Sequence, residues 1–171
     1  MNYAKDYAQF VTITCLGWKP VLATKTAKEI VVNSLRFLNK LNRIDVFAFC
    51  IMDNHMHLIW QLLNENKRED VQRDFLKYTS QRILKHLNAT NPDFVAQLRV
   101  SANDRRYQVW KRNSLSIPLY SEYVLNQKLR YIHENPVAAG LCSYPEEYHY
   151  SSARFYRNND ATFDFLSHIA G

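Results

Sequence analysis

Two histidines stand one residue apart in the apolar stretch "IMDNHMHLIW" (51–60). Successive side chains of a β-strand point to opposite faces, so His55 and His57 would share a face if this stretch is a strand. Two neutral imidazoles side by side can bind one divalent ion, with oxygen ligands completing its coordination. The pair could equally be two half-exposed strand histidines without a ligand, and this segment alone does not decide between the two.

A second candidate group lies in "QKLRYIHENPV" (127–137), which has the character of a helix. Tyr131 and Asn135 are four residues apart and would therefore share one helical face. A tyrosine hydroxyl can act as a nucleophile, and an amide oxygen suits a hard metal ion. His133 would point to another side of the helix and is not counted as a third imidazole ligand. For this segment alone, the favoured interpretation is that the tyrosine packs in the core and the asparagine caps the helix before Pro136.

Length and composition indicate one globular domain over residues 1–171, with a core at about 8–156. The 171 residues are 22% charged and 47% hydrophobic, which is ordinary for a globular protein. No apolar run is long enough to span a bilayer, the first residues lack the apolar centre of a signal peptide, and three scattered cysteines suit a reducing compartment. We therefore expect a cytoplasmic protein without membrane partners. The net charge of +6 is compatible with a polyanionic partner but does not establish one.

The elements that must position these residues follow from hydrophobic periodicity. Strands are expected at 8–18, at 43–52 and 55–63 with a turn at Asp53-Asn54, and around Tyr107–Lys111. Helices are expected at 24–42, at 67–88 and from 120 to Pro136, with Thr24 or Thr26 and Ser121 as N-caps. The order β-α-β-β-α-β-α predicts an α+β fold: a ferredoxin-like αβ sandwich whose antiparallel sheet has its helices packed mainly on one face.

Both candidate motifs together resemble the REP-associated tyrosine transposases, relatives of the single-tyrosine transposases of the HUH nuclease superfamily. "NHMHLIW" resembles the H-hydrophobic-H signature, and "YIHENPVAAGL" resembles the Y-I-x-x-N-P-V-x-x-G-L block. Three further segments also resemble parts of the family: "DFLKYTSQRIL", "VWKRN" and "EEYHYSSARFY". The resemblance covers roughly residues 10–156, and the two motifs in this order are highly specific.

The resemblance implies roles for four residues. His55 and His57 match the metal-binding pair, Tyr131 matches the nucleophile, and Asn135 matches the place of a further polar ligand. It also implies a divalent cofactor, Mg²⁺ or Mn²⁺, and a ferredoxin-like sandwich with the histidines on a central strand. The implied activity is that of a transposase: Tyr131 attacks a phosphodiester of single-stranded or hairpin DNA, such as a REP element, to give a 5′-phosphotyrosine intermediate that can be rejoined.

The chain departs from the family pattern at two places. Asp53 stands where the family commonly has proline, and "NSLSIPLYSE" (113–122) lacks the Tyr/Phe-Asp-His segment of many relatives, so recognition of a REP-type hairpin is left open. Tyr120 and Tyr123 lie near the start of the same helix as Tyr131. Tyr131 is preferred as the nucleophile because only it carries the I-x-x-N-P context.

Contacts with DNA would need cations along a groove and aromatic rings on which bases stack. The candidate DNA-binding cations are Arg73, Lys77, Arg105, Arg106, Lys111 and Arg112, with Tyr107 and Trp110 near them. The ordinary alternative is a solvated helix surface for Arg73 and Lys77 and core packing for Trp110, which is the favoured interpretation of that tryptophan.

Two other functions are alternatives to a transposase. A catalytically silent or domesticated module of the same fold would bind hairpin DNA or RNA without cleaving it. A metal-independent phosphoesterase would need a second histidine motif on a partner strand, and none surrounds the remaining histidines (His86, His133, His149, His168). The sequence leaves open the DNA target, the ion used, and whether the protein acts as a monomer or a homodimer.

Overall fold

The computed structural model describes residues 7–169, which form one four-stranded antiparallel sheet with helices on both faces. The strands are β1 (Gln9–Thr14), β2 (Ile44–Ile51), β3 (His55–Leu62) and β4 (Leu115–Pro118), in the spatial order β2-β3-β1-β4. A helix follows β1 and another follows β3, so the topology is that of a split β-α-β unit repeated. The expected ferredoxin-like α+β fold is confirmed.

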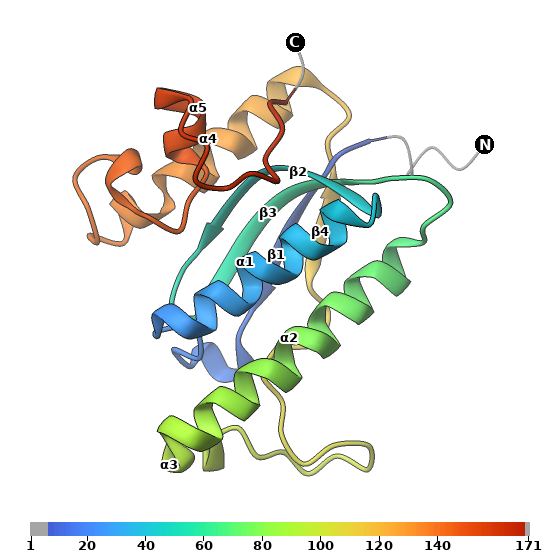
Figure 1. The fold of residues 1–171 in the computed structure, drawn as a ribbon, viewed down its shortest axis with the longest axis vertical. Helices are drawn as coiled ribbons and strands as arrows, with labels where there is room; N and C mark the ends of the chain where they lie inside the picture. The colour runs from blue at the N-terminus through green and yellow to red at the C-terminus, as the bar shows by residue number, and fades with distance from the viewer. Residues whose placement is uncertain (1–6, 170–171) are drawn as a thin grey trace.

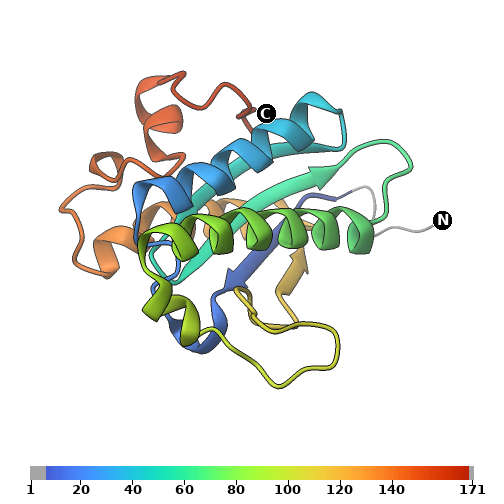
Figure 2. The ribbon, with the colours of Figure 1, turned by 60° about the horizontal axis from the view of Figure 1, so that its bottom comes forward.

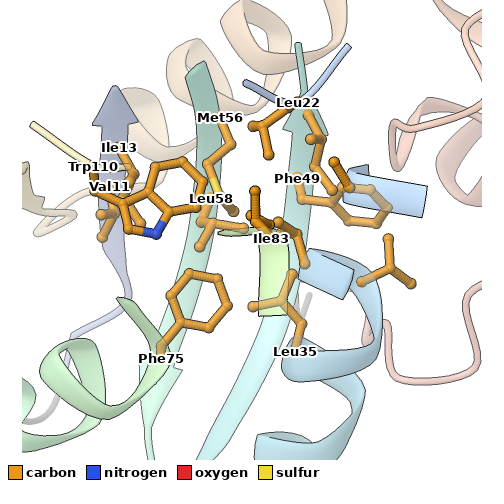
Figure 3. Close-up of a cluster of buried hydrophobic side chains, with 14 of the residues drawn as sticks. Val11, Ile13, Leu22, Leu35, Phe49, Met56, Leu58, Phe75, Ile83 and Trp110 are labelled. Atoms are coloured by element: carbon orange, nitrogen blue, oxygen red, sulfur yellow. The ribbon is translucent and has the colours of Figure 1, made fainter. Parts of the chain in front are cut away.

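Two long helices lie side by side over one face of the sheet (Figures 1 and 2). They are α1 (Lys25–Lys40), capped by the Thr24 hydroxyl, and α2 (Arg68–Thr90). The buried stripe of α2 includes Val71, Phe75, Ile83 and Leu87. Figure 3 shows side chains of these helices, among them Leu35 and Phe75, meeting those of β1, β2 and β3. This is the larger hydrophobic core.

Helix α4 (Glu122–Ala138) covers the opposite face of the sheet, behind the strands in Figure 1. The Ser121 hydroxyl accepts from the backbone N–H of Val124 and caps the helix as expected. Ile132 is fully buried in a smaller cluster with Phe10, Ala48, Cys50 and Ile59 of the strands. Two helices thus share one face as predicted, and α4 packs on the face to which β3 turns its histidines.

The expected end of this helix at Pro136 is wrong by two residues, because α4 continues through Pro136 to Ala138. Proline has no N–H to donate to the carbonyl four residues before it, but its fixed φ is compatible with a helix. The following turn is closed by the N–H of Ala139, which donates to the Asn135 carbonyl at 3.0 Å.

The fourth strand also differs from the expectation around Tyr107–Lys111, because β4 lies at Leu115–Pro118. The expected segment is tied instead to the end of β1: Trp110 forms a bridge with Cys15, and the Lys111 N–H donates to the Thr14 carbonyl at 2.7 Å. Trp110 is buried and its indole N–H donates to the Thr79 hydroxyl at 3.0 Å, so its expected role in packing is confirmed. The apolar pattern of residues 107–111 therefore reflects packing of Trp110 in the core and not a regular strand.

The segment after α4 runs along the outer edge of β2. It contains the short helices η3 (Pro145–Glu147) and α5 (Ala153–Asn158). The N–H groups of Ser152 and Ser167 donate to carbonyls of β2, at 2.9 and 3.0 Å. The remaining short helices are η2 (Leu16–Trp18) and α3 (Pro92–Ala96). Within residues 7–169 no helix is long and apolar enough to cross a membrane.

Candidate active site

His55 and His57 lie on the same face of β3, on the side covered by α4, as strand alternation predicts. Each ring is held through its Nδ1 atom. Nδ1 of His57 is 2.9 Å from the hydroxyl of Thr12, its direct partner on β1, and Nδ1 of His55 is 2.7 Å from Oδ1 of Asn54. These contacts leave the Nε2 atoms of both rings directed away from their own strand. A metal-binding histidine is typically oriented in this way.

Helix α4 brings Asn135 to both Nε2 atoms. Its Oδ1 lies 3.3 Å from Nε2 of His55, and its Nδ2 lies 3.4 Å from Nε2 of His57. The burial of Ile132 fixes which side of α4 faces the sheet, and residues one turn apart share that side. The helix therefore presents Asn135 to the histidines because of its own periodicity and one apolar anchor.

Tyr131 lies one turn before Asn135 and beside His57. The centroids of these two rings are 5.2 Å apart, and the Tyr131 ring also meets Phe10 edge to face at 6.0 Å. The ammonium of Lys128, one turn earlier, lies 5.7 Å from the centre of the Tyr131 ring and 4.8 Å from that of Phe10. Tyr131 is still 49% exposed. An incoming strand could therefore reach its hydroxyl.

Both histidines are neutral near pH 7. Burial lowers the pKa of His57 to about 3, and the charges of His55 and Lys128 act in the same direction. Burial also lowers the pKa of His55, although its hydrogen bond with Asn135 opposes this change. A neutral imidazole keeps one lone pair, which is the form that binds a metal ion.

The residues fit a divalent ion. Among residues 7–169 no three His, Cys, Asp or Glu side chains gather at one place, so an amide would have to supply the third protein ligand. In the orientation found, Asn54 presents an oxygen to Nδ1 of His55, which assigns the hydrogen to that nitrogen. Nε2 of neutral His55 then lies 3.3 Å from Oδ1 of Asn135 with its lone pair available to a cation, whereas protonated His55 would donate a hydrogen bond to that oxygen. Two imidazoles and an amide oxygen suit Mn²⁺ or Mg²⁺, whose remaining coordination positions water or phosphate oxygens would fill.

The six candidate DNA-binding cations do not gather around this site. Arg73 and Lys77 are exposed on α2, which covers the other face of the sheet, and Arg73 pairs with Asp70 at 2.9 Å. Arg105, Arg106 and Arg112 lie in the segment between α3 and β4, where Arg105 pairs with Asp104. Lys111 lies nearer to the two histidines, because its backbone N–H donates to the carbonyl of Thr14, which pairs with His55.

Five residues that contact the predicted site were not predicted from the sequence: Phe10, Thr12, Trp18, Asn54 and Lys128. Thr12 could have been found only from the register between β1 and β3, which puts it opposite His57. Lys128 lies at helical spacing before Tyr131, so periodicity offered a signal for it. Trp18 meets His55 edge to face, with ring centroids 5.9 Å apart, and carried no signal in the sequence.

Comparisons with known proteins identify the fold. No protein-family model and no curated protein sequence matches this chain. A solved structure of a REP-associated tyrosine transposase bound to a REP hairpin is similar, with 14% identity and a TM-score of 0.65 over 98% of this chain and 89% of that one. A candidate transposase from Deinococcus radiodurans R1 aligns at 16% identity and a TM-score of 0.42, over 75% of this chain and 91% of that one. The chain thus has the fold of a REP-associated tyrosine transposase over almost its whole length.

Proposed function

We propose that this protein is a transposase-like, metal-assisted endonuclease and strand transferase for single-stranded DNA, of the REP-associated tyrosine transposase type. The observation that carries the proposal is the convergence of three groups on one face of the sheet. The Asn135 amide on α4 lies within 3.4 Å of Nε2 of both His55 and His57 on β3, and the half-exposed Tyr131 lies beside His57. A potential ligand set and a nucleophile are therefore adjacent.

In the proposed reaction the Tyr131 oxygen attacks the phosphorus of a phosphodiester. A bond forms between that oxygen and phosphorus, the bond from phosphorus to the 3′ oxygen breaks, and the phenolic proton leaves to solvent while the departing oxygen gains one. The products are a 5′-phosphotyrosine and a free 3′-OH. Attack by a 3′-OH reverses the step and rejoins DNA without an added energy source.

The protein's own contribution is orientation and charge. A phenol is a weak nucleophile, so attack by Tyr131 benefits from an activated phosphate. A bound divalent ion would polarise the phosphate and stabilise the charge that develops on its oxygens. Thr12 and Asn54 hold the imidazoles in place. Phe10 and Lys128 restrict the Tyr131 ring.

Hairpin DNA is the proposed substrate. The similar solved structure is of a transposase bound to a REP hairpin. The net charge of +6 is also compatible with a nucleic acid partner. The cation set proposed for DNA contact remains Arg73, Lys77, Arg105, Arg106, Lys111 and Arg112. Because these side chains lie on more than one surface, we expect Lys111 to contribute most near the site of cleavage.

The test is the formation of a covalent adduct. The protein is incubated with Mn²⁺ and a library of labelled hairpins that carry single-stranded flanks, and the products are separated on a denaturing gel. Wild type should give a labelled protein band that a chelator abolishes and that Tyr131→Phe lacks. Tyr123→Phe is the matched control, because Tyr123 begins the same helix and is 78% exposed.

An adduct that survives Tyr131→Phe and disappears in Tyr123→Phe would refute the assignment of the nucleophile. An adduct of undiminished yield in the presence of chelator would refute the role of the metal. Hairpin binding without any adduct across the library would instead favour the catalytically silent binding module.

A further inference from the structure

Trp18 has a backbone conformation that a tryptophan rarely adopts. Its φ is +56°, and that of Gly17 before it is +60°. For a bulky residue a positive φ is a strained outlier. Its side chain gains little from burial in return, because it is 58% exposed, whereas Trp60 and Trp110 are buried. Neither conformational preference nor core packing accounts for a tryptophan here.

The turn that carries Trp18 is firmly attached to the sheet. The N–H of Cys15 donates to the Asn54 carbonyl and the N–H of Leu16 to the Val109 carbonyl, both at 2.8 Å. The N–H of Trp18 donates to the Cys15 carbonyl at 3.1 Å. These bonds fix the turn to the residue that precedes His55. The indole is therefore held in place beside the predicted site.

The indole and the Tyr131 ring flank the two histidines. Trp18 contacts His55 and Tyr131 contacts His57, while the two imidazoles are 4.9 Å apart. The planes of Trp18 and His55 are 67° apart, an edge-to-face contact, and Trp18 is 58% exposed and therefore accessible to a stacking partner.

Lysine residues lie in the turn of Trp18 and in the segment that is hydrogen-bonded to it. The Lys19 ammonium lies against the turn, 3.3 Å from where a Cβ on Gly17 would be. Lys111 is exposed and bonded to Thr14, the strand neighbour of His55. The side chain of the neighbouring Trp110 points away from this segment to Thr79 on α2. An exposed aromatic ring next to cations is the arrangement by which proteins bind single-stranded nucleic acids.

We propose that Trp18 is a stacking platform for an unpaired base next to the phosphate that Tyr131 attacks. The inference rests on the proposed function and adds to it the residue that holds the flank of the cleavage site. Stacking a base on an aromatic side chain tolerates any sequence, because every base has a π-face. Removal of the ring should weaken binding of a single-stranded flank about tenfold, which is within the range found for such contacts.

The binding test uses tryptophan fluorescence in the Tyr131→Phe background, so that no cleavage occurs. The probe is the same hairpin library, with and without single-stranded flanks. Since Trp18 is the exposed one of the three tryptophans, quenching by the flanked probe reports on it. Trp18→Asn should lose the quenching and about tenfold in affinity, and Trp18→Phe should keep most of the affinity. Phe37→Ala is the control, because Phe37 is 61% exposed on α1 and should bind as wild type.

Stability provides a second readout. Asparagine tolerates positive φ better than other non-glycine residues, so Trp18→Asn should melt at the same temperature as wild type or higher. A variant that is no less stable yet binds about tenfold more weakly would support a binding role. Equal affinity, or a lower melting temperature in Trp18→Asn, would overturn it and make Trp18 a packing residue.

The inference and the proposed function fail in different ways. If wild type forms the Tyr131 adduct but flanked probes do not quench Trp18, the stacking platform is refuted and the proposed activity stands. If flanked probes quench Trp18 but no adduct forms with Mn²⁺, the stacking platform is supported and the proposed activity is refuted.

Discussion

His57 should make the stability of this fold depend on pH. The ring is 3% exposed and its pKa is lowered from 6.5 to about 3, because burial, His55 and Lys128 all disfavour its charged form. In the unfolded chain the same ring titrates near its ordinary value. Between these two values the unfolded state binds one more proton than the folded state. Folding stability must then increase with pH across this window.

The magnitude follows from the two values of the pKa. Above pH 6.5 the ring is mostly neutral in both states and costs little stability. As pH falls toward 3, the free energy of unfolding decreases by about 1.4 kcal/mol for each pH unit. Between pH 6.5 and pH 4 the folded state should lose about 3 kcal/mol through this ring alone. A loss of this size is a large part of the 5–15 kcal/mol that typically stabilises a domain.

The assay is urea unfolding at a series of pH values between 7 and 4, in chelator so that no ion biases the histidines. His57→Gln removes the titrating group and should show a shallower dependence, smaller by about 3 kcal/mol over this range. His133, whose pKa burial and the charge of Arg157 lower to about 4, remains in both proteins and contributes equally. Identical pH dependence in wild type and His57→Gln would refute the reasoning.

Three substitutions test other contacts described above. Thr12→Val removes the hydroxyl that holds Nδ1 of His57 and should weaken Mn²⁺ binding about tenfold by calorimetry; unchanged affinity would remove Thr12 from the site. Trp110→Phe loses the bond to the Thr79 hydroxyl and leaves a cavity, so urea unfolding should show a loss of about 1–3 kcal/mol, and a neutral result would contradict this packing. Ser121→Ala removes the cap of α4 and should cost about 1 kcal/mol in the same assay, and unchanged stability would contradict a stabilising role of this cap.

Local periodicity was enough to predict how the main site residues are presented. Alternation along β3 gives His55 and His57 a common face, and the four-residue spacing gives Tyr131 and Asn135 a common side of α4. Both patterns are properties of single elements. That the two elements meet was implied by the resemblance and not by spacing, because packing between elements depends on contacts distant in sequence, such as that of Ile132 with Ile59.

What could not be predicted depends on register and on sheet face. The pairing of Thr12 with His57 requires knowing how β1 aligns with β3. The positions of Arg73 and Lys77 require knowing which face α2 covers, and their amphipathic pattern is the same for either face. β4 was missed because Ser116 and Pro118 obscure a strand pattern, while Trp110 nearby offered a stronger apolar signal from the core.

The two edges of the sheet bear on how copies of this chain could associate. At the β2 edge the backbone bonds to Ser152 and Ser167 occupy positions that a foreign strand would need. The β4 edge has only four residues, and the last is Pro118, which has no N–H to offer. Within residues 7–169 neither edge gives another chain a long row of free groups, which limits aggregation by strand addition. If two copies associate, we expect contacts between side chains and not a continuous sheet.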